Sequence, residues 1–170
     1  MLKDKNIKDL SINPFTEIGL NWMLITAGNS TSSNTMTASW GGVGFMWNKN
    51  VAYIVVRPSR YTHSFITKEG YFSLSFLPSK YKKQLNYLGS VSGRDEDKIK
   101  NSKLELDYCL IDKHEVPYFK DSNLVYICKT LFIQPYNPSS FLDSKIDVWY
   151  KDHDYHDLFI AEILKVKVNE

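Results

Sequence analysis

Short runs of aromatic and β-branched residues recur along the chain, separated by glycine, asparagine, proline and serine. Such runs are typical of β-strands that bury at least one face. They predict six strands, over Asn21–Ala27, Thr37–Trp47, Val51–Val56, Tyr71–Phe76, Leu124–Gln134 and Phe159–Val168. Glycines at positions 41, 42 and 44 interrupt the second run. They indicate a bulge, or the close approach of another backbone or a ligand. We expect Lys49-Asn50 to form the turn that follows.

Helical spacing is rare and confined to short segments. The sequence predicts a helix over Tyr61–Lys68 that ends before Gly70, and one over Ser79–Tyr87 that begins with a serine cap. Asp95–Lys100 is expected to add one or two turns, and a proline-containing stretch at 135–138 marks an irregular connection. Many short strands with few helices predict a mainly antiparallel β-barrel, in a single domain over residues 1–170. A doubly wound parallel sheet would need longer, regularly alternating helices.

Composition and charge change this picture only slightly. Apolar residues make up 43% of the 170 positions, which is enough for a sizeable core. Aromatic residues make up 14%, and such a high share is consistent with a core, a subunit interface or a ring-binding site. A net charge of +2 is too small to indicate nucleic-acid binding. Residues 1–85 carry ten Lys and Arg against four Asp and Glu. This excess favours an anionic ligand, although solvated lysines explain most of it.

The sequence lacks the motifs that mark several kinds of site, and it lacks the signals for export and for insertion into a membrane. Cys109 and Cys128 form neither a CxxC pair nor a Cys/His cluster, so we expect two buried thiols and no metal site, with a disulfide as the alternative. The N-terminus has no apolar signal region and no run is long enough to cross a membrane, which predicts a soluble cytoplasmic protein. The two common nucleotide-binding loops are also missing, because no GxGxxG follows the first strand and no GxxxxGK[ST] occurs.

The segment Arg57-Pro-Ser-Arg-Tyr-Thr62 carries the first candidate site. A strong strand runs into a proline that cannot continue the ladder, and a helix is predicted to start just after it. The first turn of a helix presents free N–H groups and a positive dipole end. Guanidinium and hydroxyl groups from Arg57, Ser59, Arg60 and Thr62 would surround that end, which makes it a candidate phosphate site. The alternative is an ordinary helix start with solvated arginines.

The segment Asn34–Gly44 carries the second candidate site. Its small residues and glycines would let a planar ring lie against the backbone, with exposed N–H groups available for hydrogen bonds. The alternative is a glycine-rich strand that bends to close a barrel. A ring platform and a phosphate clamp within a few tens of residues together favour a nucleotide-like ligand.

Two further segments are open to more than one interpretation. In Ser92-Gly-Arg-Asp95, Ser92 and Arg94 are either further phosphate or partner-subunit contacts or part of a surface loop. Asp152-His-Asp-Tyr-His156 invites a metal site, but no cysteine or further histidine supports one. An acidic, solvated turn is the alternative. His156 is the candidate for a proton donor or hydrogen-bond partner of a redox ring.

The runs at 36–44, 56–62, 72–76 and 92–95 together resemble the flavin reductase-like, FMN-binding split-barrel family, with the flavoredoxin-like branch the most similar. The resemblance implies a six-stranded split barrel with Greek-key topology and FMN at a homodimer interface. It implies ring and ribityl contacts from Thr37, Ala38, Ser39 and Trp40, phosphate contacts from Arg57, Ser59, Arg60 and Thr62, and further contacts from Ser92 and Arg94. One departure is the run Phe159-Ile-Ala-Glu-Ile, which lacks an expected glycine before the glutamate.

In that family the protein positions the flavin and the flavin carries the hydride or electron chemistry, so no protein nucleophile is required. The first hypothesis is an NAD(P)H-dependent FMN reductase, with NAD(P)H as co-substrate. The second is a flavoredoxin-like carrier that keeps FMN bound and exchanges electrons with a redox protein partner. A third, a non-redox protein with a degenerate site, conflicts with the intact phosphate segment.

Overall fold

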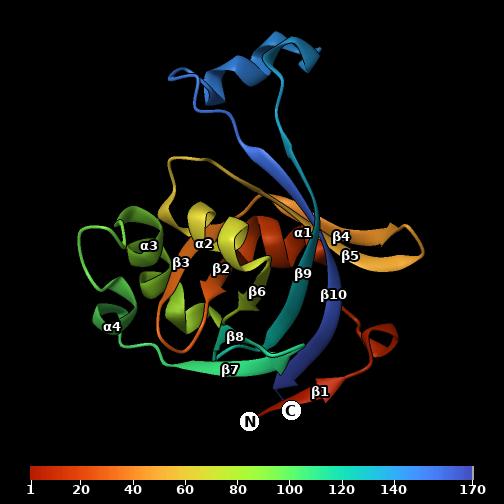
Figure 1. Ribbon diagram of the computed structural model, residues 1–170, viewed down its shortest axis with the longest axis vertical. Helices are drawn as coiled ribbons and strands as arrows, with labels where there is room; N and C mark the ends of the chain where they lie inside the picture. Colours follow the sequence, from red (N-terminus) through yellow and green to blue (C-terminus); the bar gives the residue numbers. More distant parts are fainter. Residues whose placement is uncertain (170) are drawn as a thin grey trace.

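A single antiparallel sheet of eight strands dominates the computed structural model, which describes residues 1–169 (Figure 1). Its order is β3-β2-β6-β9-β10-β5-β4, with β1 paired to β10. The strands are β1 (Leu2–Lys5), β2 (Met23–Gly28), β3 (Ser33–Ala38), β4 (Gly41–Met46), β5 (Lys49–Val56), β6 (Tyr71–Phe76), β9 (Leu124–Pro135) and β10 (Asp157–Asn169).

Helices and a separate hairpin cover parts of this sheet. The helices are α1 (Pro14–Thr16), α2 (Tyr61–Glu69), α3 (Lys82–Ser90) and α4 (Lys98–Ser102), and the hairpin consists of β7 (Leu106–Ile111) and β8 (His114–Phe119). Shorter 3₁₀ or π turns lie at Ile7–Asp9, Glu17–Asn21, Ser79–Tyr81, Pro138–Ser140 and Ser144–Trp149. No helix among residues 1–169 has the length and apolar character needed to cross a membrane.

The predicted fold class is confirmed. In space β6, β9 and β10 follow one another, and β5, which precedes all three in the chain, returns beside β10. This is a Greek-key arrangement of four antiparallel strands. The sheet has two strands more than predicted, because the segment 37–47 contributes to two strands and the N-terminus adds β1 at an edge.

The core lies against the inner face of the sheet and explains why these runs became strands. Its largest fully buried side chains include Phe72 on β6, Tyr126 on β9 and Phe159 on β10. A second cluster, around Leu85 and Leu88, anchors α3 against the sheet. Burying a large apolar side chain contributes about 1.5–3 kcal/mol, so these clusters supply much of the driving force for folding.

Two strand predictions were wrong in detail. The segment 37–47 is not one strand, because the chain leaves the sheet at Ser39 and Trp40 between β3 and β4. The turn also lies two residues earlier than predicted. Trp47 and Asn48 have φ values of +52° and +56°, so they form the corner of the β4–β5 hairpin, and Lys49 already pairs with Met46. Positive φ at both central residues is what a tight hairpin turn requires.

The predicted helices are present, with shifted boundaries. Helix α2 begins at Tyr61 and ends at Gly70, which adopts the left-handed conformation with φ +70°. Ser79 does not cap its helix but starts a 3₁₀ turn, and α3 continues through Gly89 to Ser90. The helix expected over Asp95–Lys100 begins later, where the Asp97 side chain accepts a hydrogen bond from the Lys100 amide.

An arm, residues 131–156, consists of the end of β9, which pairs with the start of β10, and the connection that follows, whose tip projects at the top of Figure 1. β9 ends at Pro135, one residue later than predicted, and the connection after it is irregular as predicted. The β7–β8 hairpin and β1 were not predicted from the sequence. Both cysteines are free and buried.

Candidate functional site

The start of α2 is a potential anion site. β5 ends at Val56, the chain turns through residues 57–60, and Arg60 occupies the N-cap position of α2. The Arg60 side chain forms no capping hydrogen bond to the first turn. The His63 N–H donates to the Arg60 carbonyl at 2.9 Å, which leaves the N–H groups of Tyr61 and Thr62 available to an anion, and the positive end of the helix dipole favours one.

A cavity of about 250 Å³ lies beside this helix start, and we call it the α2 cavity. Ser59, Arg60, Thr62 and Ser92, all predicted from the sequence, line it. Thr62 is almost fully buried, and its Oγ1 accepts a hydrogen bond of 2.8 Å from the Asn34 side-chain amide. The structure thus brings together four of the six residues expected at the phosphate end.

Two cations give the α2 cavity its electrostatic character. Arg60 donates a hydrogen bond to the Gly89 carbonyl at 3.2 Å, and burial, followed by the charge of Arg57, lowers the pKa of its guanidinium. Lys98 is only 3% exposed, and its Nζ donates to the carbonyls of Leu88 and Val91 at 3.0 Å each. Burial lowers the pKa of Lys98 to about 8. Bringing an anion close would stabilise both charges.

A second cavity of about 300 Å³, the β3 cavity, adjoins the first. Thr37, Ala38 and Ser39 at the end of β3 form one wall, and α3 forms the other. The two cavities share Gly89 and Ser90 at the end of α3. A Cβ at Gly89 would lie 3.1 Å from the Thr37 Cβ, so glycine permits the close approach of α3 and β3 here. The two cavities are therefore neighbours, and the cations line the α2 cavity.

Three of the predicted residues point elsewhere. Arg57 donates a 2.6 Å hydrogen bond to the Trp149 carbonyl and lies 4.0 Å from the Asp154 carboxylate, so its guanidinium binds the arm. Trp40 packs edge-on against the Trp149 ring at 5.2 Å. Arg94 lies over the Tyr61 ring at 4.7 Å and donates to the Ser59 carbonyl at 2.9 Å. These contacts hold the chain segments around the cavities.

The glycines of β4 have a structural explanation. At Gly41, which has φ +145°, a Cβ would lie 2.5 Å from the Tyr53 carbonyl oxygen on β5, and at Gly42 a Cβ would overlap the Tyr53 ring. Close approach within the sheet therefore accounts for both glycines. The sequence left three explanations open for these glycines: a bulge, another backbone close by, or a ligand. At Gly41 the explanation is the close approach of the β5 backbone.

Several lining residues were not predicted from the sequence. They come from the segment before β2, from α3 and from the start of α4: Trp22, Leu85, Asn86, Gly89, Ser90 and Lys98. Gly89-Ser90 at the end of a predicted helix was a usable signal for a close approach. Lys98 had none, because only the folded chain shows that its amine is buried beside Arg60.

His156 is buried, in contrast to the solvated turn considered for this segment. Its Nδ1 lies 2.9 Å from the Tyr150 hydroxyl, and its ring centroid is 5.3 Å from that of Trp40. Burial, and then the charge of Arg57, lowers the pKa of His156 to about 4. The imidazole is therefore neutral at neutral pH and can form hydrogen bonds there, but it is not a source of imidazolium protons.

The lowered pKa of His156 predicts acid-sensitive stability. As the pH falls below about 6.5, the unfolded chain binds a proton that the folded chain takes up only near pH 4. The free energy of unfolding therefore decreases by up to about 3 kcal/mol as the pH falls from 6.5 to 4. When the free energy of unfolding is measured in urea at several pH values, it should depend less steeply on pH in His156→Asn than in the wild type. The exposed His153→Asn is the control, and an unchanged slope in His156→Asn would contradict the assignment.

Among residues 1–169, no group of three His, Cys, Asp or Glu side chains is arranged to hold a metal ion. The site is thus defined by two adjoining cavities, one cationic at a helix start and one between a strand and a helix.

The comparisons with known proteins identify the family. The flavin reductase-like domain matches residues 16–170, and the chain belongs to this family. None of the curated protein sequences matches the chain.

Solved structures of similar fold agree with this assignment. An FMN-binding domain of a flavin reductases-like enzyme from Shewanella baltica has a TM-score of 0.71 and 18% identity, covering 99% of this chain and 77% of that one. Flavoredoxin from Methanosarcina acetivorans has a TM-score of 0.69 and 24% identity, covering 99% and 76%. An NADH:FAD oxidoreductase from Streptomyces globisporus has a TM-score of 0.62 and 16% identity, covering 88% and 75%. These likenesses show a shared split-barrel fold.

Proposed function

We propose that the chain binds FMN, with the flavin ring in the β3 cavity and the phosphate in the α2 cavity. The observation that carries this proposal is that the two cavities lie next to each other and share Gly89 and Ser90 in their linings. One end offers a helix start with two cations, which suits a phosphate. The other is an open hollow over the contact between the end of β3 and α3, on which a flat ring could lie.

The residues present fit such a ligand. Arg60 and Lys98 would face the phosphate charge, and the hydroxyls of Thr62 and Ser92 add hydrogen-bonding groups, whereas the Ser59 hydroxyl donates to the Asp154 carboxylate. Thr37, Ala38 and Ser39 would lie along the ring. Trp40 and Arg57 contact the arm, and Arg94 contacts the 57–60 turn, so these three would affect FMN indirectly by holding those segments in place. Bound FMN would supply the hydride or electron transfer. The chain's own groups would hold, orient and partly shield it from water.

The proposed activity is transfer of hydride or electrons between NAD(P)H and FMN. The neighbouring structure named as an NADH:FAD oxidoreductase supports this reaction class. Purified protein should be mixed with FMN and with NADH or NADPH, and the absorbance of the reduced nicotinamide followed. Oxidation well above the rate with FMN alone is the expected result. Retained FMN without oxidation would favour a flavoredoxin-like carrier with a protein partner, and failure to bind FMN would overturn both.

We also propose that the protein is a homodimer. Apolar side chains are exposed along the start of the arm and on the β4–β5 hairpin, where the Trp47 and Phe132 rings lie 6.2 Å apart. The exposed members are Phe45, Met46, Trp47, Leu131, Phe132 and Ile133, and we call them the arm patch. Exposed apolar side chains gathered on neighbouring elements in this way are characteristic of protein interfaces. A second copy of the chain would cover it.

Replacing Phe132 with aspartate should dissociate this dimer. The change places a charge within the arm patch, where burial in an interface would leave it without a partner. Sedimentation or light scattering should show a dimer for the wild type and a monomer for Phe132→Asp at micromolar concentrations. Leu110→Asp, an equally drastic change at an exposed position on β7, should remain dimeric. A monomeric wild type, or a dimeric Phe132→Asp, would refute the assignment.

A further inference from the structure

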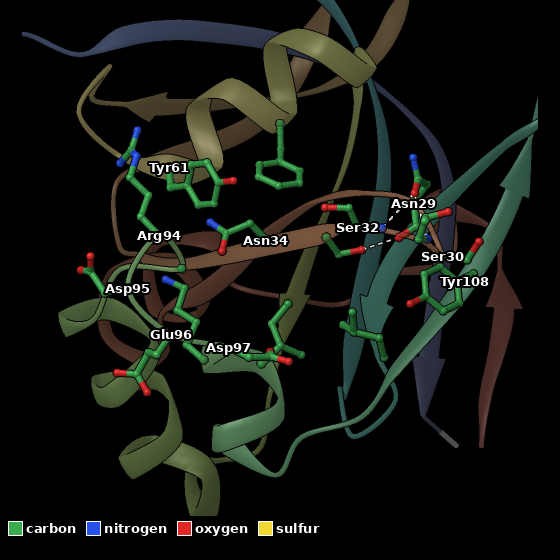
Figure 2. A pocket seen from close by; sticks show the side chains of 17 residues that line it. Asn29, Ser30, Ser32, Asn34, Tyr61, Arg94, Asp95, Glu96, Asp97 and Tyr108 are labelled. Carbon is green, nitrogen blue, oxygen red and sulfur yellow. Dashed lines mark hydrogen bonds between the residues drawn. The ribbon is translucent and has the colours of Figure 1, made fainter.

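Asn34, on β3, carries a buried amide group that lines the α2 cavity. The residue is only 4% exposed, and it also borders a hollow of about 510 Å³ that opens beyond the start of α2. Figure 2 shows its side chain between Tyr61 on α2 and the loop that carries Arg94. Buried polar groups in native structures are hydrogen-bonded. The hydrogen-bond partner of this amide therefore indicates its role.

The Asn34 amide nitrogen donates a hydrogen bond of 2.8 Å to the Thr62 hydroxyl oxygen. Thr62 is the second residue of α2 and is 1% exposed. A hydroxyl group has one proton to donate and accepts through the lone pairs of its oxygen. Because the Thr62 oxygen accepts from Asn34, its proton has to point toward another group.

The proton of the Thr62 hydroxyl has no acceptor within the described part of the chain. The Ser64 hydroxyl, by contrast, donates at 2.8 Å to the Tyr61 carbonyl three residues before it. The carbonyl three residues before Thr62 is that of Ser59, and it accepts from the Arg94 guanidinium at 2.9 Å. A buried donor without an acceptor costs about 1–3 kcal/mol. An acceptor brought into the α2 cavity would remove that cost.

The loop after α3 restricts the Asn34 amide from the other side. A Cβ at Gly93 would overlap the Asn34 side-chain oxygen, so glycine is what lets the loop come this close. The Asn34 backbone is fixed as well, because it pairs with Ala27 in the β2–β3 ladder. The amide is thus confined between a strand and a loop, and this confinement keeps its nitrogen directed at Thr62.

We propose that Asn34 is a positioning residue that orients the Thr62 hydroxyl, so that its proton is donated to a phosphate oxygen in the α2 cavity. The inference rests on the proposed function, because the FMN phosphate is the acceptor that it assigns to this proton. Arg60 and Lys98 attract an anion by charge, whereas Thr62 adds a donor of fixed direction. A donor held in place by a supporting residue loses less freedom when the ligand binds. Asn34 therefore strengthens phosphate binding without a contact of its own.

The test compares the dissociation constants of riboflavin and FMN for the protein freed of flavin, by quenching of flavin fluorescence. Riboflavin lacks the phosphate, so the ratio of its constant to that of FMN reports the phosphate contacts. Thr62→Val should lower this ratio by about tenfold, the effect of one hydrogen bond to a charged group. Asn34→Ala should lower it by about three- to tenfold, because the hydroxyl remains but is free to turn. Asn101→Ala, which removes an exposed amide outside the α2 cavity, should leave it unchanged.

A double-mutant cycle separates orientation of the hydroxyl from packing of the loop. If Asn34 acts through the Thr62 hydroxyl, Asn34→Ala should have no further effect on the ratio in the Thr62→Val background. An equal effect in both backgrounds would mean that Asn34 acts through the Gly93 loop, and this result would overturn the inference. Asn34→Ser ends one atom short of the amide nitrogen. It should match Asn34→Ala and replaces it if that variant does not fold.

The possible outcomes distinguish this inference from the proposed function. If the wild type binds FMN more tightly than riboflavin and the ratio is unchanged in the Asn34 variants, the role of Asn34 alone is overturned. Equal affinity of the wild type for FMN and riboflavin would overturn that role together with the position of the phosphate. Binding of neither flavin would overturn the proposed function as a whole.

Discussion

Replacing Arg60 with alanine is expected to weaken FMN binding by on the order of 1.5–3 kcal/mol, the contribution of a hydrogen bond between charged groups. The reason is its position: among the three arginines of the predicted segments, Arg60 is the one that lines the α2 cavity at the helix start. Titration calorimetry or flavin fluorescence would measure the change. Arg60→Lys should recover part of the affinity, because it keeps the charge but not the planar fork of donors.

The structure supplies two controls for this experiment. Lys68→Ala removes a well-exposed cation from the last turn of the same helix, so it should leave FMN binding unchanged. Arg57→Ala should affect FMN less than Arg60→Ala does, because the Arg57 guanidinium binds the Trp149 carbonyl in the arm. Unchanged affinity in Arg60→Ala would show that the phosphate lies elsewhere.

Replacing Phe159 with alanine is expected to destabilise the fold by about 3–5 kcal/mol, the usual cost of removing a large aromatic side chain from a core. Phe159 is fully buried on β10, which lies between β5 and β9. Its ring packs edge-on against that of His63, with the ring centroids 5.4 Å apart. The surrounding strands are paired on both sides, so they have little freedom to close the resulting space. Urea unfolding followed by circular dichroism would measure the loss.

Phe15→Ala is the matched control for the core substitution. The same atoms are removed at a position that is 86% exposed, so the unfolding midpoint should move little. A loss below about 1 kcal/mol in Phe159→Ala would mean that β10 does not contribute to the core as described. Measurements on protein without flavin would keep ligand binding from adding to the apparent stability.

The arm brings together several residues that have no relation in the sequence. Trp149 lies edge-on to Trp40, its carbonyl accepts a hydrogen bond from Arg57, and Asp154 forms a 2.5 Å hydrogen bond with Ser59. The predicted ring and phosphate segments are therefore both tied to the arm. Changes in the arm should consequently alter flavin binding as well as dimer formation.

The local sequence was sufficient for most elements of the fold. Alternating apolar runs determined where strands form, because burying one face of each run requires an extended chain, and Gly70 ended α2 because it can adopt a positive φ. The β7–β8 hairpin was missed because its strands, one of them interrupted by Pro117, lack a clear apolar alternation. The turn at Trp47-Asn48 was missed because a bulky aromatic residue such as Trp47 rarely adopts positive φ and no glycine marks the turn.

The sequence by itself determined the family, the fold class and three groups at the start of α2, Ser59, Arg60 and Thr62, since the strand, the proline and the helix that follow one another there are local features. Only the tertiary structure decided that Arg60 faces the cavity while Arg57 binds the arm, that Lys98 is buried beside Arg60, and that His156 is neutral. The physical reason is that the direction of a side chain and the pKa of a buried group depend on neighbours far away in the chain, which a local pattern does not contain.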